Sequence, residues 1–317
     1  MRLIGILSLL FFFSAGASAK TEEELLLEVQ VGTEWGKHVA SNVLPNLPGH
    51  LSRVAHGVAE FKRGSAFIIK TSDPRRVIFA TNAHVMVDDN DVLAGDLGPY
   101  KANLELACHD RDAMSEPIEK VRLGLLGKTG RCKKVIGIWP SVDFALFEAE
   151  FSGVDASVLN AYAVDLPVKS KIEFGQQLAM FGFGHFLNPG DPELDLMYIR
   201  DKDCQVFSAT NDFRYISDPD EYSPAKYKVW SFVLGCDVSW GDSGAPILDL
   251  MTGHLAGIIF TGKYPKNQNI SLNASAMDRL RATPQEIAWS NLNFGVPISK
   301  IIEIVRGQSW PESEGVL

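Results

Sequence analysis

The sequence is poor in cysteine, in positive charge and in long hydrophobic segments. Its four cysteines form no Cys-x-x-Cys pattern, and the adjacent Cys108 and His109 are poorly placed to ligate one ion together. We therefore expect no metal site, and we expect no cofactor. Asp and Glu outnumber Lys and Arg, and the net charge of −9 argues against nucleic acid or a polybasic membrane contact as partners.

No apolar run reaches the roughly 20 residues that a membrane-spanning helix needs, so no stable membrane anchor is expected. The apolar run at residues 3–13 follows Arg2 and precedes Ala17-Ser18-Ala19. A basic residue, a short apolar core and an Ala-x-Ala site are typical of a secretory signal peptide, whereas a buried N-terminal helix fits this ending poorly. We expect residues 1–19 to be removed and the mature chain to be secreted or periplasmic.

Export to an oxidising compartment would allow the cysteines to form disulfides. Four cysteines permit three different pairings. We favour Cys108–Cys132 together with Cys204–Cys236, because each of these pairs closes a local loop on one side of the midpoint of the chain.

Beyond Pro45 and Pro48 the sequence is typical of an all-β protein. Short runs rich in β-branched and aromatic residues, bounded by Gly, Pro or Asp, predict strands. Little helical periodicity separates these runs, which favours an antiparallel barrel or sandwich. The expected strands cover residues 54–62, 65–70, 77–81, 135–139, 144–149, 177–182, 227–235, 246–250, 255–260 and 293–297.

The segments outside these strands suggest how the chain is organised. Residues 20–51 are expected to form an N-terminal leader, and the polar residues 183–225 an insertion or long surface loops. No internal repeat, low-complexity tract or long linker indicates a further module. A tail is expected at 308–317. A short C-terminal helix is predicted at 297–306 from the helical spacing of Ile298, Ile301, Ile302 and Val305.

Residues 241–246, Gly-Asp-Ser-Gly-Ala-Pro, carry the strongest chemical signal in the chain. A serine hydroxyl must be activated by a base, and the oxyanion that its attack creates must be stabilised. Glycine beside Ser243 allows a tight turn in which backbone N–H groups converge near the hydroxyl. If Ser243 is a nucleophile, the chain must also supply a histidine and a carboxylate.

His84 and Asp143 are the candidates for these two roles. His84 stands where an apolar strand ends in a polar turn, and Asp143 precedes an apolar run. A carboxylate drawn into the core needs hydrogen-bond donors, and a histidine N–H is a suitable one. Taken singly, a core histidine and a surface aspartate before a strand are the commoner explanations. The order His84, Asp143, Ser243 in one chain favours catalysis.

Residues 81–84 (Thr-Asn-Ala-His), 143–146 (Asp-Phe-Ala-Leu) and 241–246 resemble, in this order, the three signatures of trypsin-like serine peptidases of the chymotrypsin superfamily. Residues 293–298 and the helix after them are similar to that family too. Within that family, the sequence resembles bacterial exported peptidases of the Deg and glutamyl-endopeptidase kinds more than digestive enzymes. The resemblance covers residues 52–307, the expected peptidase domain, with 183–225 unmatched.

This resemblance implies two antiparallel six-stranded β-barrels, over about residues 52–155 and 172–296, with a short C-terminal helix. It also implies a serine endopeptidase that acts on protein or peptide substrates in the cleft between the barrels. Ser243 would be the nucleophile, His84 the base and Asp143 the acid that orients it. The backbone N–H groups of Gly241 and Ser243 would form the oxyanion hole.

The resemblance also bears on specificity and activation. Asp237 lies where an acid at the base of the specificity pocket selects Arg or Lys in trypsin-like enzymes, and Gly262 would keep a pocket wall open. An acid that merely hydrogen-bonds a loop is the alternative for Asp237. Digestive relatives pair a freed N-terminus with an acid in the place of Asp242. Since Arg53 lies too near the first barrel strands for such a cut, we expect activity without it.

Two other functions are compatible with parts of this pattern. An α/β-hydrolase esterase needs Gly-x-Ser-x-Gly, but Ala245 replaces the last glycine, and His254 is the one histidine after Ser243. A catalytically silent trypsin-fold protein that binds peptides is the stronger alternative. Such relatives usually lose a triad residue, and all three are present here. The sequence leaves the oligomeric state open.

Overall fold

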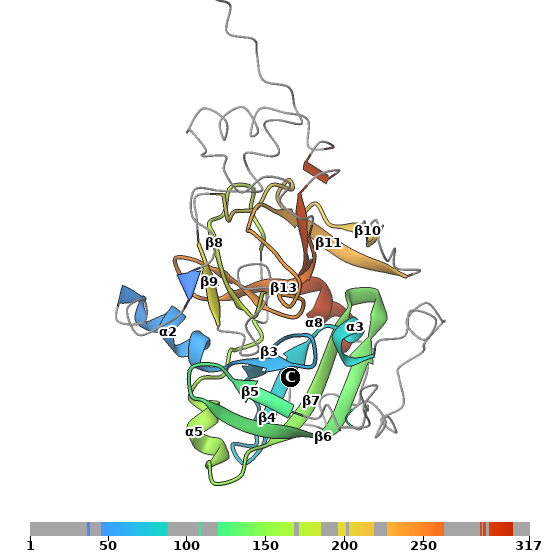
Figure 1. The fold of residues 1–317 in the computed structure, drawn as a ribbon. Helices are drawn as coiled ribbons and strands as arrows, with labels where there is room; N and C mark the ends of the chain where they lie inside the picture. Colours follow the sequence, from blue (N-terminus) through green and yellow to red (C-terminus); the bar gives the residue numbers. More distant parts are fainter. Residues whose placement is uncertain are drawn as a thin grey trace, which may run out of the picture.

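The computed structural model describes residues 37–38, 46–87, 108, 120–167, 171–184, 196–200, 203–218, 227–262, 286, 288–289 and 292–306. These residues form two β units, the first at the bottom and the second at the top of Figure 1. The expected signal peptide at residues 1–19, the tail at 308–317 and most of the leader at 20–51 lie outside the described residues.

The first unit is a closed antiparallel barrel. Its strands follow the order β2 (Val58–Phe61), β3 (Gly64–Ile69), β4 (Val77–Thr81), β7 (Phe144–Glu150), β6 (Lys128–Trp139) and β5 (Lys120–Leu123). The core contains a stack of aromatic rings, in which the centroid of Phe147 lies 4.3 Å from Phe61 and 5.4 Å from Phe79. These buried rings come from three different strands and therefore hold the barrel walls together.

The second unit is built on one antiparallel sheet. Its order is β1 (Lys37–His38), β9 (Met197–Ile199), β8 (Leu178–Gly182), β12 (Pro246–Asp249), β13 (Leu255–Thr261), β14 (Asn293–Pro297), β11 (Lys228–Leu234) and β10 (Arg214–Ser217). Residues 204–207 join its two sides, because Leu178 N donates to Cys204 O at 2.7 Å and Phe207 N to Val233 O at 2.9 Å. With this segment as sixth member, β8, β12, β13, β14 and β11 close into a barrel.

The prediction of two antiparallel barrels and a C-terminal helix is confirmed. Helix α8 (Ile298–Arg306) buries the four apolar side chains that predicted it. It packs against β13 and β14 of the second barrel and also against the 3₁₀ helix η3 (Pro140–Val142) of the first. The helix therefore helps to fasten the two barrels together. Among the described residues, no helix is both long and apolar enough to cross a bilayer.

One expected strand is wrong at its start. The strand predicted over residues 54–62 begins only at Val58, because residues 49–56 form helix α2 (Gly49–His56). This helix crosses the start of the expected peptidase domain at residue 52 and buries Leu51, Val54 and Ala55. Their spacing of three and four residues is helical, and Pro48 directly precedes the helix. Two strands, β9 and β10, lie within the 183–225 stretch that was expected to be loops.

Both expected disulfides are present in the structure. Cys108 is bonded to Cys132 on β6, and Cys204 is bonded to Cys236. The second bond joins the segment that closes the second barrel to the residue after β11 and before Asp237. It therefore restrains the chain on the approach to the serine turn.

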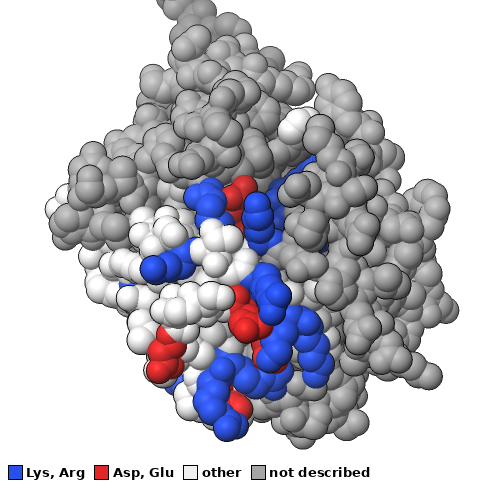
Figure 2. Space-filling model, turned by 60° about the horizontal axis from the view of Figure 1, so that its bottom comes forward, with Lys and Arg blue, Asp and Glu red and all other residues white. Residues whose placement is uncertain are grey.

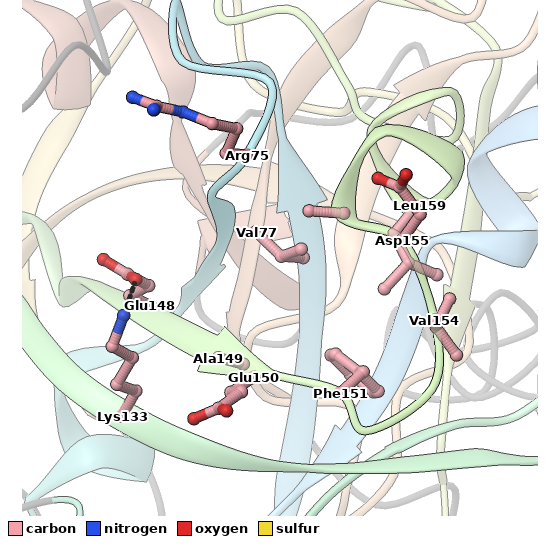
Figure 3. A pocket seen from close by; sticks show the side chains of 11 residues that line it. Arg75, Val77, Lys133, Glu148, Ala149, Glu150, Phe151, Val154, Asp155 and Leu159 are labelled. Carbon is pink, nitrogen blue, oxygen red and sulfur yellow. Dashed lines mark hydrogen bonds and ion pairs between the residues drawn. The ribbon is translucent and has the colours of Figure 1, made fainter.

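A network of charged side chains lies at the end of the first barrel where β7 finishes. Glu148 accepts hydrogen bonds from Arg76 Nε at 2.9 Å and from Lys133 Nζ at 2.7 Å. Figure 2 turns this barrel toward the reader and shows basic side chains interspersed with acidic ones. Beside the network is a hollow of about 300 Å³ with apolar side chains such as Val77 and Phe151 in its lining (Figure 3). The charges at this end are largely paired with one another.

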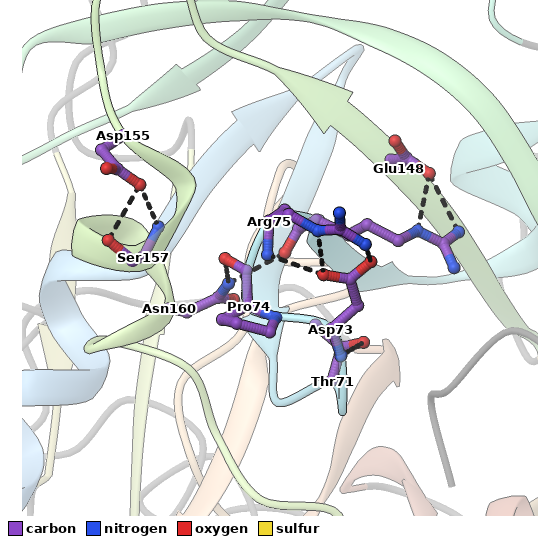
Figure 4. Close-up of polar contacts among 9 residues, drawn as sticks. Thr71, Asp73, Pro74, Arg75, Glu148, Asp155, Ser157 and Asn160 are labelled. Carbon is purple, nitrogen blue, oxygen red and sulfur yellow. Dashed lines mark hydrogen bonds and ion pairs between the residues drawn. The ribbon is translucent and has the colours of Figure 1, made fainter.

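Hydrogen bonds also tie the turn before β4 to helix α5 (Ala156–Asn160), as Figure 4 shows. Asn160 Nδ2 lies 2.9 Å from the carbonyl oxygens of both Pro74 and Arg76, to which it donates. Asp73 holds the guanidinium of Arg75 through two contacts of 2.9 Å. Because β4 leads directly to His84, this bracing fixes the far end of the strand that carries the candidate base.

Glu148→Gln should destabilise the fold by about 1–3 kcal/mol at pH 7, because it leaves Arg76 and Lys133 facing a neutral amide. Burial opposes ionisation of Glu148, but the hydrogen bonds from Lys133 and Arg76 outweigh it and lower the pKa of the carboxyl. Its contribution is therefore present above the ordinary pKa of glutamate and lost as the pH falls through the lowered value. Urea unfolding at pH 7 and at pH 3 measures both effects.

Glu150→Gln is the matched control on the same strand. Glu150 pairs with Arg131 at 3.3 Å, but both side chains are more than half exposed. An exposed pair contributes roughly 0–1 kcal/mol. Equal losses of stability in the two variants would contradict the importance assigned to Glu148.

Candidate active site

Ser243 lies in a tight turn just before β12. The turn is closed by a hydrogen bond from Ala245 N to Asp242 O at 2.8 Å. Gly241 and Gly244 have φ values of +98° and +85°, a backbone region that L side chains rarely adopt. The two glycines of the sequence motif are thus required by the shape of the turn that presents Ser243.

The first barrel holds this turn directly. Ser65 on β3 donates its backbone N–H to Ser243 O at 2.8 Å and its hydroxyl to Gly241 O at 2.7 Å. A side chain on Gly244 would overlap the carbonyl of Ser65 and the hydroxyl of Thr81. The serine turn is therefore seated against the strand end that leads into His84.

His84 is fixed by two hydrogen bonds to one carboxylate. It lies in helix α3 (Ala83–Met86), directly after β4. Its backbone N–H donates to Asp143 Oδ1 at 2.9 Å, and its ring Nδ1 lies 2.7 Å from Asp143 Oδ2. An ionised carboxylate can only accept, so Nδ1 carries the proton and Nε2 is left as the basic nitrogen of the neutral ring.

Asp143 is fully buried and sits in an unusual backbone conformation. Its φ of 38° is left-handed, which costs about 1–2 kcal/mol in an L residue and is best tolerated by Asp and Asn. Its own carbonyl accepts a hydrogen bond from Asn82 Nδ2 at 2.9 Å. Since His84 supplies a donor to each carboxylate oxygen, the cost of burying the charge is offset.

The structure brings the three candidate catalytic residues to the junction of the barrels. His84 and Asp143 come from the first barrel, and Ser243 comes from the second. The His84 ring meets Phe260 of β13 with a centroid separation of 6.3 Å. A hydrogen-bonded acid–base pair can activate a serine hydroxyl that comes within its reach.

Asp237 and Gly262 also lie in one region of the second barrel. Asp237 is buried, with 2 % of its surface exposed. A side chain on Gly262 would collide with Val238, the next residue after Asp237. Asn293 donates to Cys236 O at 2.6 Å and lies beside Gly262 as well. The two expected specificity residues are thus held close together by the strands around them.

Asp242, next to the candidate nucleophile, is buried with a strongly shifted pKa. Its Oδ2 accepts from Ser239 N at 2.9 Å and from Ser239 Oγ at 3.1 Å. Among the described residues, Oδ1 has no hydrogen-bond partner. Burial raises the pKa of Asp242 to about 7, against the hydrogen bonds from Ser239 and Gly184, which lower it. Gly182 and Gly184 approach so closely that a side chain on either would strike the carboxyl group.

Residues 64–258 match the family described as the trypsin-like peptidase domain. The match spans more than half of the chain, and the chain belongs to this family. The fold is accordingly that of a protease, which implies peptide substrates. Two disulfides are consistent with a location outside the cytoplasm. Comparison with curated proteins gave no match.

Three solved structures are similar to the chain. An inactive form of Rv3671c from M. tuberculosis H37Rv is 15% identical, with a TM-score of 0.45 over 86% of this chain and 95% of that one. Deg5 is 17% identical, with a TM-score of 0.42 over 83% of this chain and 93% of its own. A Glu endopeptidase in complex with MPD is 11% identical, with a TM-score of 0.45 over 88% and 100%.

Several side chains that shape this site were not predicted from the sequence. Asn82 lies within the Thr-Asn-Ala-His motif of residues 81–84, and its position two residues before His84 was the available signal. Ser65 carried no signal, because its partner is a backbone carbonyl that only the fold brings near. Ser239 precedes its partner Asp242 by three residues, and this spacing was the available signal. Phe260 reads as an ordinary core residue in an apolar run.

Asp242 makes the stability of the protein depend on pH. A carboxyl whose pKa is raised from 3.8 to about 7 on folding stabilises the folded state fully below pH 3.8. This contribution is lost as the pH rises through 7, by roughly 4 kcal/mol between pH 4 and pH 8. Asp242→Asn should remove that part of the pH dependence. Urea unfolding of both proteins at pH 5 and pH 8 checks this, and parallel changes in the two would contradict it.

Proposed function

We propose that the chain is a serine endopeptidase that hydrolyses peptide bonds through an acyl-enzyme. The observation that carries the proposal is the buried Asp143 carboxylate that accepts both N–H groups of His84. This pairing fixes the imidazole with Nε2 available as a base, beside the turn that presents Ser243. It agrees with the peptidase family to which the chain belongs.

In the proposed reaction, Ser243 Oγ attacks the substrate carbonyl while His84 Nε2 takes the hydroxyl proton. The C–N bond then breaks, His84 returns the proton to the leaving amine, and an ester of Ser243 remains. Water, deprotonated by the same nitrogen, releases the acid product. Asp143 holds the imidazole in the required tautomer and stabilises the imidazolium that forms at each step.

The N–H groups of Gly241 and Ser243 are proposed to stabilise the oxyanion. Neither donates a hydrogen bond to another residue in the described part of the chain. The positive φ of Gly241 and the bond from Ser65 to its carbonyl fix the orientation of the peptide units around this turn. One such donor is worth about 3–4 kcal/mol of transition-state stabilisation in comparable sites.

We further propose that Asp237, with Gly262 beside its segment, selects Arg or Lys before the scissile bond. A buried carboxylate gains most from a cationic partner, because the attraction is strong where water is excluded. Gly262 leaves space that a side chain would take from Val238 and its surroundings. The peptidase domain is proposed to span residues 52–307, in a chain that is secreted or periplasmic after loss of residues 1–19.

Activity is proposed not to need cleavage after Arg53. The residue lies within helix α2, and its Nη1 donates to Ala163 O at 2.9 Å. Val54, which such a cut would turn into a new terminus, is 1 % exposed. Cleavage there would have to unfold a helix whose apolar face is part of the core.

Ser243→Ala should abolish hydrolysis and labelling by a fluorophosphonate while leaving the fold intact, because no other oxygen occupies the position of the nucleophile. Labelling, mass mapping of the modified residue and hydrolysis of casein are the measurements. Ser157→Ala, at an exposed position on α5, is the control and should behave as the native protein. Hydrolysis by Ser243→Ala would sink the proposal, and a folded native protein that resists labelling would favour the silent peptide-binding alternative.

Asp237→Asn should lower kcat/KM for peptides with Arg or Lys before the scissile bond by roughly 100-fold, the loss of about 3 kcal/mol from a buried ion pair. Matched peptides with Leu or Glu at that position should change much less. Asp165→Asn, on a surface pair with Lys70, is the control. A native enzyme that cuts Leu or Glu peptides as fast as Arg peptides would show that Asp237 does not set specificity.

A further inference from the structure

The candidate base touches an aromatic side chain that belongs to the other barrel. Phe260 lies on β13, and its ring meets that of His84 at a centroid distance of 6.3 Å and an interplanar angle of 63°. The arrangement is edge-to-face, a favoured geometry for two rings. Phe260 is 1 % exposed, whereas 29 % of the His84 side chain is exposed, so the Phe260 side of the contact is the one closed to solvent.

A second aromatic ring, that of Tyr227, packs against Phe260. The centroid of Tyr227 lies 6.5 Å from that of Phe260, and Tyr227 is 7 % exposed. Burial, together with the charges of Asp143 and Asp218, raises the pKa of Tyr227 far above its ordinary value. The phenol is therefore uncharged at any working pH and lies within electrostatic reach of Asp143. His84, Phe260 and Tyr227 form a row of rings that crosses from one barrel to the other.

The second barrel also covers the segment that leads into Asp143. The 3₁₀ helix η3 ends one residue before Asp143 and packs against β11 and α8. Val142 and Asp143 are both fully buried as a result. The acid of the pair is thus shielded from water by elements that belong largely to the barrel that carries Ser243.

Exclusion of water matters to this pair because the strength of an ionic hydrogen bond depends on its surroundings. Two unit charges 4 Å apart attract by about 1 kcal/mol in water and about 4 kcal/mol near a protein surface, where the effective dielectric constant is about 20. Water that reached Asp143 would compete for its oxygens and free the His84 ring to turn. Both changes would weaken the stabilisation of the imidazolium.

We propose that Phe260 is a positioning residue that holds the His84 imidazole in register with Asp143 and keeps water from the pair. The role of the ring depends on the docking of the second barrel, so the base becomes competent only when the two barrels meet. This inference rests on the proposed function, in which His84 is the base. Among the described residues, Tyr227 lies within electrostatic reach of Asp143 and also of Asp218, which accepts from Thr261 Oγ1 at 2.8 Å.

The test compares Phe260→Ala, Phe260→Leu and Phe232→Ala. Phe232 is the matched control, because it is equally buried in the second barrel but its ring packs beside Gly257 and Gly295. The rate constant for labelling by a fluorophosphonate is measured from pH 5 to pH 9, normalised to the folded fraction. Peptide hydrolysis then separates kcat from KM.

Phe260→Ala should lose roughly 10- to 100-fold in labelling rate and in kcat with little change in KM, as expected when a reacting group is misplaced. The acid limb of its pH profile should move to lower pH, because a hydrated Asp143 stabilises the protonated ring less. Phe260→Leu should recover to within about threefold of the native rate, since a bulky apolar side chain still excludes water. Native behaviour of Phe260→Ala, or equal losses in Phe232→Ala, would overturn the proposal.

A proton resonance offers a readout that does not depend on catalysis. The proton between His84 Nδ1 and Asp143 Oδ2 gives a separate downfield signal only while its exchange with water is slow. The signal should be present in the native protein and in Phe232→Ala and be lost in Phe260→Ala. Retention of the signal in Phe260→Ala would refute the proposal that Phe260 keeps water from the His84–Asp143 pair. A native protein that keeps the signal but resists labelling would refute the proposed function and leave Phe260 a purely structural role.

Discussion

The hydrogen bonds between His84 and the buried carboxylate of Asp143 are the constraint on which the rest of the site depends. A carboxylate with no exposed surface must find donors, and here the backbone and the ring of one residue supply both. This requirement fixes helix α3, which follows β4 and carries His84, to Asp143, which directly precedes β7. Strand β4 pairs with β7 along its whole length, from Val77 with Ala149 to Thr81 with Ala145. One end of the β4–β7 strand pair therefore carries His84 and Asp143, and hydrogen bonds from Asn160 fix the other end of β4.

The second barrel completes this arrangement through backbone contacts. The serine turn can reach the first barrel only because Gly241 and Gly244 accept a left-handed backbone and because Gly244 has no side chain. Ser65 then holds the turn by two of its donors. The aromatic row from His84 through Phe260 to Tyr227 crosses the same junction. Formation of the site is thus coupled to the docking of the barrels, since the first barrel carries the His84–Asp143 pair and the second carries Ser243.

The features that the sequence could predict are those set by local patterns. The serine turn, the strand end before His84 and the amphipathic helix α8 each follow from spacing within a few residues. Helix α2 was missed because its last residues join an apolar run that continues into β2. Strand β9 was missed because it has only three residues, and β10 because its residues alternate between half-buried and exposed with little apolar character. The contacts of Ser65 with Gly241 and of His84 with Phe260 cross between the barrels and depend on tertiary approach, which no local pattern encodes.

In the proposed enzyme, which needs no activating cleavage, the contacts of Asp242 take the place of a pairing with a freed N-terminus. The turn that presents Ser243 contains the buried carboxyl of Asp242. Its Oδ2 accepts hydrogen bonds from the backbone and the hydroxyl of Ser239, three residues earlier in the same segment. Gly182 and Gly184 leave room for this carboxyl because neither has a side chain. A carboxyl that is held by its own segment needs no charge brought from elsewhere to hold the turn, and with a pKa of about 7 it is partly protonated near neutrality. Among the described residues no cation lowers the pKa of Asp242, and a protonated carboxyl has little charge to neutralise.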